Sequence, residues 1–255
     1  MSSTSDKPTD EFYINYAPAP RSYQRFLFRF LPLLVIGRIL FSVVFPGLHN
    51  QFNSARIQGT TELEGLLVGE PVPHLIVPRP GNVASQVPFT RYLLSGTGKS
   101  TPRADVLEQV GQWVKLTGTL ISRNQLSIIA VRGAEPVEPP ADVTLNPADG
   151  NSLGSFSLTG EILDSKCYLG TMKPGQSKTH RACAIRCISG GVPAVFRVQN
   201  SRDDVMYFLL VDGQGQAVND RVLDLVADPV RITGTVMQYD DLFVLEAEPS
   251  TYERV

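Results

Sequence analysis

Two stretches of this chain share one pattern, and the repetition limits what the chain can fold into. The segment "VKLTGTLISRNQLSIIAV", which starts at Val114, aligns without a gap with "VRITGTVMQYDDLFVLEA", which starts at Val230. In each, an apolar strand containing Thr-Gly-Thr leads through a polar turn into a second apolar strand. This pattern is typical of a β-hairpin, with the central glycine at a bulge or a sharp bend. The chain therefore carries the same supersecondary unit twice.

Each hairpin closes a unit that opens on a strand containing glycine, "ELEGLLV" in the first and "FSLTGEIL" in the second. Units of about 90 residues with a kinked first strand and a closing hairpin favour a small five-stranded barrel of the oligonucleotide/oligosaccharide-binding (OB) type. We predict a mainly β chain with a first barrel-like domain at residues 56–137, a linker at 138–153 and a second OB-like domain at 154–250. "DVLEQVGQW" predicts a short helix in the first unit, and we assign Asp240-Asp241 in the second hairpin to ordinary turn chemistry.

An apolar run near the N-terminus has the length of a membrane span. Residues 26–48, "FLFRFLPLLVIGRILFSVVFPGL", are apolar except for Arg29 and Arg38. A bilayer crossing takes about 20 residues. A cation such as Arg38 near the middle costs about 3 kcal/mol, which apolar neighbours offset and which snorkelling reduces. We predict a transmembrane anchor here, in preference to a cleaved signal peptide or the buried helix of a soluble domain.

The basic residues around this run predict its orientation. Arg21, Arg25 and Arg29 precede or begin it, whereas only Arg56 follows nearby. Positive charge favours the cytoplasmic side of a membrane. Residues 1–25 are therefore expected to form a cytoplasmic tail, with the barrels on the other side of the membrane.

Two binding functions are not expected. The net charge of -2 argues against a protein that binds nucleic acid by neutralising phosphates. The segment "LLSGTGKST", residues 93–101, ends like a phosphate-binding loop, but Leu93 stands where that loop needs its first glycine. Pro102 follows almost at once, so we predict a strand that ends in a glycine-rich turn and no nucleotide site.

The chemistry is concentrated in "DSKCYLGTMKPGQSKTHRACAIRC", which begins at Asp164 and contains all three cysteines and one of the three histidines. Cys167 directly follows an expected strand. The residues "THRACAIRCI" predict a short helix with Ser177 or Thr179 as its N-cap and "SGG" as its end. On that helix His180, Cys183 and Cys187 would share one narrow stripe.

Three thiolates and an imidazole are typical ligands of tetrahedral zinc, and they also suit Cu(I) or an iron–sulfur cluster. We predict a zinc site, with copper as the alternative, at Cys167, His180, Cys183 and Cys187. Asp164 and Lys166 are expected beside it, orienting the imidazole or lowering thiol pKa values. An ideal helix separates His180 from Cys187 by about 10 Å, so one ion reaches both only if the helix loosens.

The same residues allow two other interpretations. Positions three and four apart on a helix also form a core-facing stripe, on which cysteines are simply buried. In an oxidising compartment Cys167 could instead pair with Cys183 or Cys187, or Cys183 with Cys187. The segment contains no Cys-x-x-Cys and no Cys-x-x-Cys-His, which argues against a thioredoxin-like site and against attached c-type haem.

"GEILDSKC" followed by "HRACAIRCISGGVPAVF" resembles a signature of uncharacterised bacterial exported or membrane-anchored proteins. Their segments read Gly-x-Ile-x-Asp-Ser-x-Cys, then His-x-x-Cys-x-x-x-Cys, then Gly-Gly and an apolar strand. The resemblance covers about forty residues of the second unit and implies no particular reaction. It implies a bacterial origin, hence an inner-membrane anchor with periplasmic barrels, and it implies that the three cysteines and His180 act together.

The sequence thus predicts a membrane-anchored extracytoplasmic metal-binding protein with a structural or accessory role, for example in a membrane complex. No catalytic residue is identified. One alternative is a thiol-disulfide redox protein that uses the same cysteines. The other is a module that binds protein or glycan, in which the cysteines only stabilise the fold.

Overall fold

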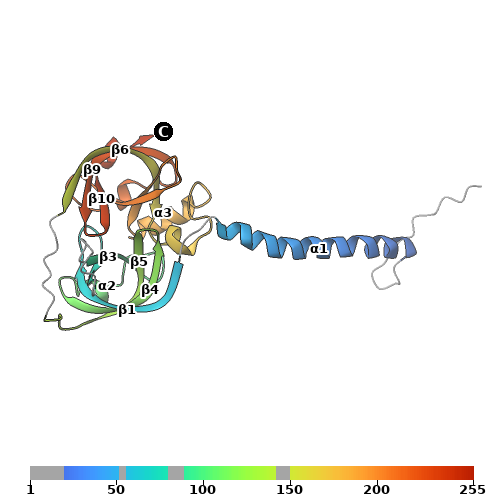
Figure 1. Ribbon diagram of the computed structural model, residues 1–255, viewed down its shortest axis with the longest axis horizontal. Helices are drawn as coiled ribbons and strands as arrows, with labels where there is room; N and C mark the ends of the chain where they lie inside the picture. The colour runs from blue at the N-terminus through green and yellow to red at the C-terminus, as the bar shows by residue number, and fades with distance from the viewer. Residues whose placement is uncertain (1–19, 52–55, 80–88, 142–149) are drawn as a thin grey trace, which may run out of the picture. The chain divides into compact units, whose positions relative to one another are not determined.

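The computed structural model describes residues 20–51, 56–79, 89–141 and 150–255, and the chain divides into two compact units at residues 1–51 and 52–255. The first unit contains helix α1 (Arg21–Gln51), drawn in blue in Figure 1. Its large apolar side chains from Tyr23 to Phe45 are exposed, and Arg21–Pro46 is long and apolar enough to cross a membrane or to act as a signal sequence. Most of the expected tail, residues 1–19, lies outside the described residues.

The first barrel in the second unit is closed. Its elements are β1 (Arg56–Val68), β2 (His74–Pro78), β3 (Phe89–Ser95), α2 (Ala104–Leu107), β4 (Trp113–Arg123) and β5 (Leu126–Pro136). The strands pair in the order β1-β2-β3-β5-β4, and β1 pairs with β4 to close the ring. Only the β3–β5 pair among these is parallel. The helix predicted from "DVLEQVGQW" is present but short.

The second barrel contains more inserted structure. Its elements are β6 (Asn151–Asp164), η1 (Cys167–Thr171), α3 (Arg181–Ser189), β7 (Ala194–Gln199), β8 (Val205–Val211), η2 (Asn219–Arg221), β9 (Pro229–Tyr239), β10 (Leu242–Glu246), η3 (Pro249–Thr251) and β11 (Glu253–Arg254). Strand β10 pairs with both β8 and β9, so the ring β6-β7-β8-β10-β9 also closes, and β11 adds to the edge of β9.

The two rings have the same connectivity, because β8 and β10 form a parallel pair in the second just as β3 and β5 do in the first. This confirms the predicted pair of OB-like barrels and the short helix inserted into the second. Part of the expected linker, residues 142–149, lies outside the described residues. In Figure 1 the first barrel is coloured cyan to green and the second yellow to red.

Equivalent glycines explain why each barrel can curve tightly. A side chain on Gly65 would place its Cβ 2.3 Å from the carbonyl oxygen of Ile76, and one on Gly160 would lie 2.2 Å from that of Arg197. Gly118 sits at a shift of register between β4 and β5, as the predicted bulge requires. A Cβ on Gly234, the equivalent glycine of the second hairpin, would lie 2.3 Å from the carbonyl oxygen of Glu246. Glycine is needed at these points because neighbouring backbones approach closely.

The two barrels pack against each other through a continuous apolar core. One cluster of buried residues contains Leu93, Ile121 and Ile128 from the first barrel together with Tyr168 and Leu209 from the second. At this junction η1 is pressed against β4, since a Cβ on Gly170 would lie 2.5 Å from the side chain of Ile121. The segment that carries Cys167 is therefore held between the barrels.

A polar contact also joins the barrels, and it corrects the interpretation of Asp240 and Asp241. They do lie in the β9–β10 turn, but their carboxylates reach the first barrel. Asp240 pairs with the Arg91 guanidinium at 2.8 Å, and both side chains are almost fully buried. Asp241 accepts a hydrogen bond from the Arg91 backbone and pairs with Arg79 at 2.6 Å. The turn acts as a bridge between domains, which its local sequence does not indicate.

Candidate metal centre

The structure brings the three cysteine sulfurs together. Cys167 begins η1, directly after β6 and its turn, whereas Cys183 and Cys187 lie one helical turn apart on α3. The three Sγ atoms lie within 4.8 Å of one another, and Cys167 and Cys187 approach to 3.5 Å. Cys167 and Cys187 are buried and Cys183 is partly exposed, so the cluster opens to solvent on the side of Cys183.

Asp164, at the end of β6, holds the two cysteine-bearing segments in place. Its Oδ1 accepts hydrogen bonds from the backbone N–H groups of Cys167, at 2.5 Å, and Lys166, at 3.2 Å. Its Oδ2 pairs with His180 Nε2 at 2.7 Å, immediately before α3. The side chains of Asp164 and His180 are fully buried. A single carboxylate thereby ties the start of η1 to the start of α3, which fixes the spacing of the sulfurs.

His180 does not join the sulfurs, and the predicted set of three thiolates and an imidazole is corrected to the three thiolates. Within the described residues, the group of donors that converges contains Cys167, Cys183 and Cys187 alone. His180 is the N-cap residue of α3, one position before Arg181, so the predicted N-cap is also wrong. Its Nε2 is engaged by Asp164, and in the described part of the chain its buried Nδ1 has no hydrogen-bond partner. The physical reason is distance along the helix, which places His180 too far from Cys187 for one ion to bridge.

A residue that the sequence did not indicate lies against all three sulfurs. The Lys99 ammonium is 2.6 Å from the Cys183 sulfur, 3.5 Å from that of Cys187 and 3.9 Å from that of Cys167. Lys99 belongs to "SGTGKST", which forms the predicted strand end and turn after β3. The first barrel thus contributes a cation to a cluster of sulfurs on the second. In the sequence this turn stood out only by its glycine-rich spacing, which resembles a phosphate-binding loop without fitting it. Nothing in that spacing indicates a contact with the cysteines.

Lys166 supports the Lys99 turn and does not orient His180. Its ammonium donates to the carbonyl oxygens of Gly96, at 2.5 Å, and Gly98, at 2.7 Å. Burial lowers the Lys166 pKa, while the nearby cysteines oppose that change. Lys166 therefore links the cysteine segment of the second barrel to the turn of the first.

The environment of Cys167 and Cys183 favours protonated thiols in the absence of an ion. The hydrogen bond with Cys187 is the main reason that the pKa of Cys167 is raised, and burial adds to it. Burial also raises the pKa of Cys183, although the hydrogen bond from Lys99 opposes this. A metal ion would have to supply the energy to deprotonate these thiols. Thiolates gathered in this way are soft donors, suited to Cu(I), zinc or an iron–sulfur cluster.

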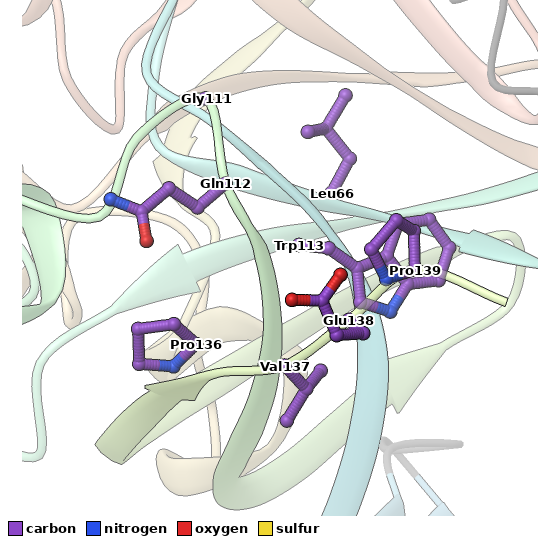
Figure 2. Close-up of a pocket in the computed structure, with 8 residues that line it drawn as sticks. All are labelled: Leu66, Gly111, Gln112, Trp113, Pro136, Val137, Glu138 and Pro139. Atoms are coloured by element: carbon purple, nitrogen blue, oxygen red, sulfur yellow. The ribbon is translucent and has the colours of Figure 1, made fainter.

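Clefts also lie elsewhere on the described part of the barrels, and two of them are large or enclosed enough to consider as sites. An open cleft of about 660 Å³ on the first barrel is lined by residues near the start of β4 and after β5, which Figure 2 shows. They include Trp113, the single tryptophan of the chain, and Glu138. A smaller cavity of about 310 Å³ lies between the barrels, beside His74 and Arg91. In neither does the described structure gather thiols or other donors that match the predicted metal site.

Comparisons with known proteins identify no family for the chain. No family model matches the sequence, and no curated protein matches it. Among solved structures, a deletion mutant of the single-stranded DNA binding protein from Thermus aquaticus aligns at 12% sequence identity with a TM-score of 0.22. That alignment covers 78% of this chain and 95% of that chain. A likeness at this level carries no argument about what this chain binds.

Proposed function

We propose that this chain is a membrane-anchored metal-binding protein whose cluster of three cysteines binds one thiophilic ion, in a structural or accessory role. The observation that supports the proposal is the convergence of the Cys167, Cys183 and Cys187 sulfurs within 4.8 Å around a positively charged group. A pocket that holds a cation among three sulfurs has the polarity and the donors of a metal site. A thiophilic ion would make stronger contacts there than an ammonium group.

The number of ligands changes which metal we favour, from zinc to copper. Structural zinc is almost always bound by four ligands. In the described residues the cluster contains three, because His180 is held by Asp164. Three thiolates form a complete trigonal set for Cu(I), whereas zinc would need an added water. Copper(I) is therefore the ion we favour, and zinc with a water ligand is the second choice.

The apolar helix α1 supports a proposal for where in the cell the protein lies. We place α1 across the inner membrane of a bacterium, with the N-terminus in the cytoplasm and both barrels in the periplasm. The positive charges of Arg21, Arg25 and Arg29 at the N-terminal end of the helix support this orientation. The resemblance of the cysteine segment to exported and anchored bacterial proteins supports the compartment. A protein fixed at the membrane surface in this way is suited to assist a membrane complex.

Metal analysis of the full-length protein tests the proposal. Protein purified in detergent under reducing, anaerobic conditions should bind about one Cu(I) per chain, measured by elemental analysis after removal of free ion. Cys183→Ser should weaken this binding by about tenfold or more, because only two of the three soft thiolate ligands remain. Lys178→Met, which changes an exposed residue, should leave it intact. Folded wild-type protein that binds neither copper nor zinc would overturn the proposal.

A second candidate function is thiol-disulfide exchange, favoured by the 3.5 Å separation of the Cys167 and Cys187 sulfurs. A small movement would bring these atoms to bonding distance in an oxidising compartment and leave Cys183 free. Thiol titration of unfolded protein purified without reductant distinguishes the two functions. One free thiol per chain supports the disulfide, and three support the metal site. The structure itself has three free cysteines.

A further inference from the structure

Lys99 already stands where the proposed ion would bind. Its Nζ lies between 2.6 and 3.9 Å from all three sulfurs. No bound ion can occupy the centre of the sulfur cluster while an ammonium is there, because the two would overlap and both are positively charged.

The backbone that carries Lys99 is fixed, whereas its side chain has room to turn outward. The Lys99 carbonyl is packed so closely on the end of α3 that a Cβ on Gly190 would lie 2.0 Å from it. The Thr101 N–H donates to the Gly190 carbonyl at 2.8 Å, and Lys166 holds the two glycine carbonyls of the turn. Lys99 itself is exposed, and it covers the same side of the cluster on which Cys183 is partly exposed. A long, unbranched side chain on a rigid turn can swing without disturbing either barrel.

We propose that Lys99 is a displaceable cap, whose ammonium occupies the sulfur cluster in the metal-free protein and moves into solvent when a metal ion binds. The inference rests on the proposed function, since it describes how the same site is filled. The cap contacts all three sulfurs and so occupies the position that an ion would take. It also sets the affinity, because every ion that binds must first break the contacts of the ammonium.

Chemical labelling of lysine tests the displacement directly. Full-length reduced protein in detergent is treated with a water-soluble acetylating reagent, with and without one equivalent of Cu(I), and each lysine is quantified by peptide mass spectrometry. We expect acetylation of Lys99 to rise about tenfold with copper, since its amine leaves the sulfurs. Lys178, exposed in both states, and Lys166, held by carbonyl oxygens, should not change.

The outcomes separate the cap from the metal site. Copper bound at one ion per chain with unchanged labelling of Lys99 overturns the cap and leaves the proposed function standing. Protein that binds neither copper nor zinc overturns both, and if only zinc binds, the labelling is carried out with zinc instead. A rise in labelling that is confined to Lys99 and depends on the added ion supports both.

Replacement of the cap provides a second, independent measurement. In Lys99→Met an ion meets no ammonium, so the affinity for Cu(I), measured by competition with a chelator of known strength, should rise about tenfold, equivalent to about 1.4 kcal/mol. Lys178→Met is the matched control and should bind like the wild type. A fall in affinity for Lys99→Met would show that the lysine supports the bound ion, and would overturn the proposal.

Discussion

At the scale of single residues, the carboxylate of Asp164 connects the two backbone segments that carry the cysteines. It accepts from two backbone N–H groups with one oxygen and pairs with His180 with the other. All of these groups lie out of contact with water, where a lost partner costs far more than on the surface. The sulfur cluster depends on this residue because the carboxylate positions the two backbone segments that carry the cysteines.

Asp164→Ala should therefore reduce the free energy of unfolding by about 3 kcal/mol or more, because it leaves His180 and the N–H of Cys167 buried without their partner. Asp164→Asn keeps one acceptor oxygen and should lose less. The measurement is urea unfolding of the full-length protein in detergent. Asp105→Ala, which removes an exposed carboxylate from the pair with Arg103, is the control and should leave the stability close to that of the wild type. Equal losses in Asp164→Ala and Asp105→Ala would contradict this role.

The burial of the His74 side chain should make the stability of the protein depend on pH. The Nδ1 of His74 donates to the Val72 carbonyl at 2.9 Å, and its Nε2 lies 3.2 Å from Arg91. Burial, aided by the charge of Arg91, lowers the His74 pKa to about 4. The unfolded chain, in which the pKa is about 6.5, therefore binds a proton that the folded protein does not bind between these values. Stability should be complete above pH 6.5 and fall as the pH drops toward 4, by up to about 3 kcal/mol.

The comparison of His74→Gln with the wild type isolates this contribution. Urea unfolding at a series of pH values from 7 to 4 should show a shallower loss of stability in the variant, since the histidine that takes up the proton is absent. Other groups, including Glu161, whose burial raises its pKa, titrate in both proteins and cancel in the difference. Parallel pH profiles for the two proteins would contradict the assignment.

At the scale of elements, the hairpin of β4 and β5 contains two glycines with different surroundings, so that a substitution at one serves as the control for the other. A Cβ on Gly118 would lie 2.4 Å from the Ile129 side chain and 2.8 Å from the Ala130 carbonyl oxygen. On the facing strand β5, a Cβ on Gly133 meets nothing within 4 Å. Gly118→Ala should therefore lower the free energy of unfolding by about 1–3 kcal/mol through overpacking. Gly133→Ala should be close to neutral, and thermal unfolding of both variants checks the difference.

The same elements show which parts of the structure could be read from sequence. The hairpins around Gly118 and Gly234 and the Gly-kinked first strands were predictable, because strand patterning is local. The convergence of the cysteines was also predictable, since one short segment carries all three. His180 was assigned to the metal because it shares a stripe of the helix with the cysteines, although the helix places it too far from Cys187. Its pairing with Asp164 could not be predicted, because it depends on how the turn after β6 folds. Lys99 was missed because its contact crosses from one barrel to the other, and no local pattern records such a contact.

At the scale of the whole molecule, the junction between the barrels explains why the site exists at all. The sulfurs come from the second barrel and the capping lysine from the first, so neither barrel alone forms the complete site. The shared apolar core and the buried pair of Arg91 and Asp240 hold the two parts in register. A change in the packing of the barrels would move Lys99 relative to the sulfurs.

This coupling predicts that the barrels unfold together. Trp113, the single tryptophan, reports on the first barrel by fluorescence, and the buried thiol of Cys187 reports on the second by its reactivity. In urea both signals should change at one midpoint in the full-length protein. Asp240→Asn, which removes one charge of the buried pair, should destabilise both barrels together by about 3 kcal/mol, because the buried charge of Arg91 loses its counter-ion. The exposed pair of Glu62 and Lys115 is the control, and Glu62→Gln should leave the stability close to that of the wild type. Separate midpoints for the two probes in the wild type would show that the barrels are independent, and the site would then not be held by their junction.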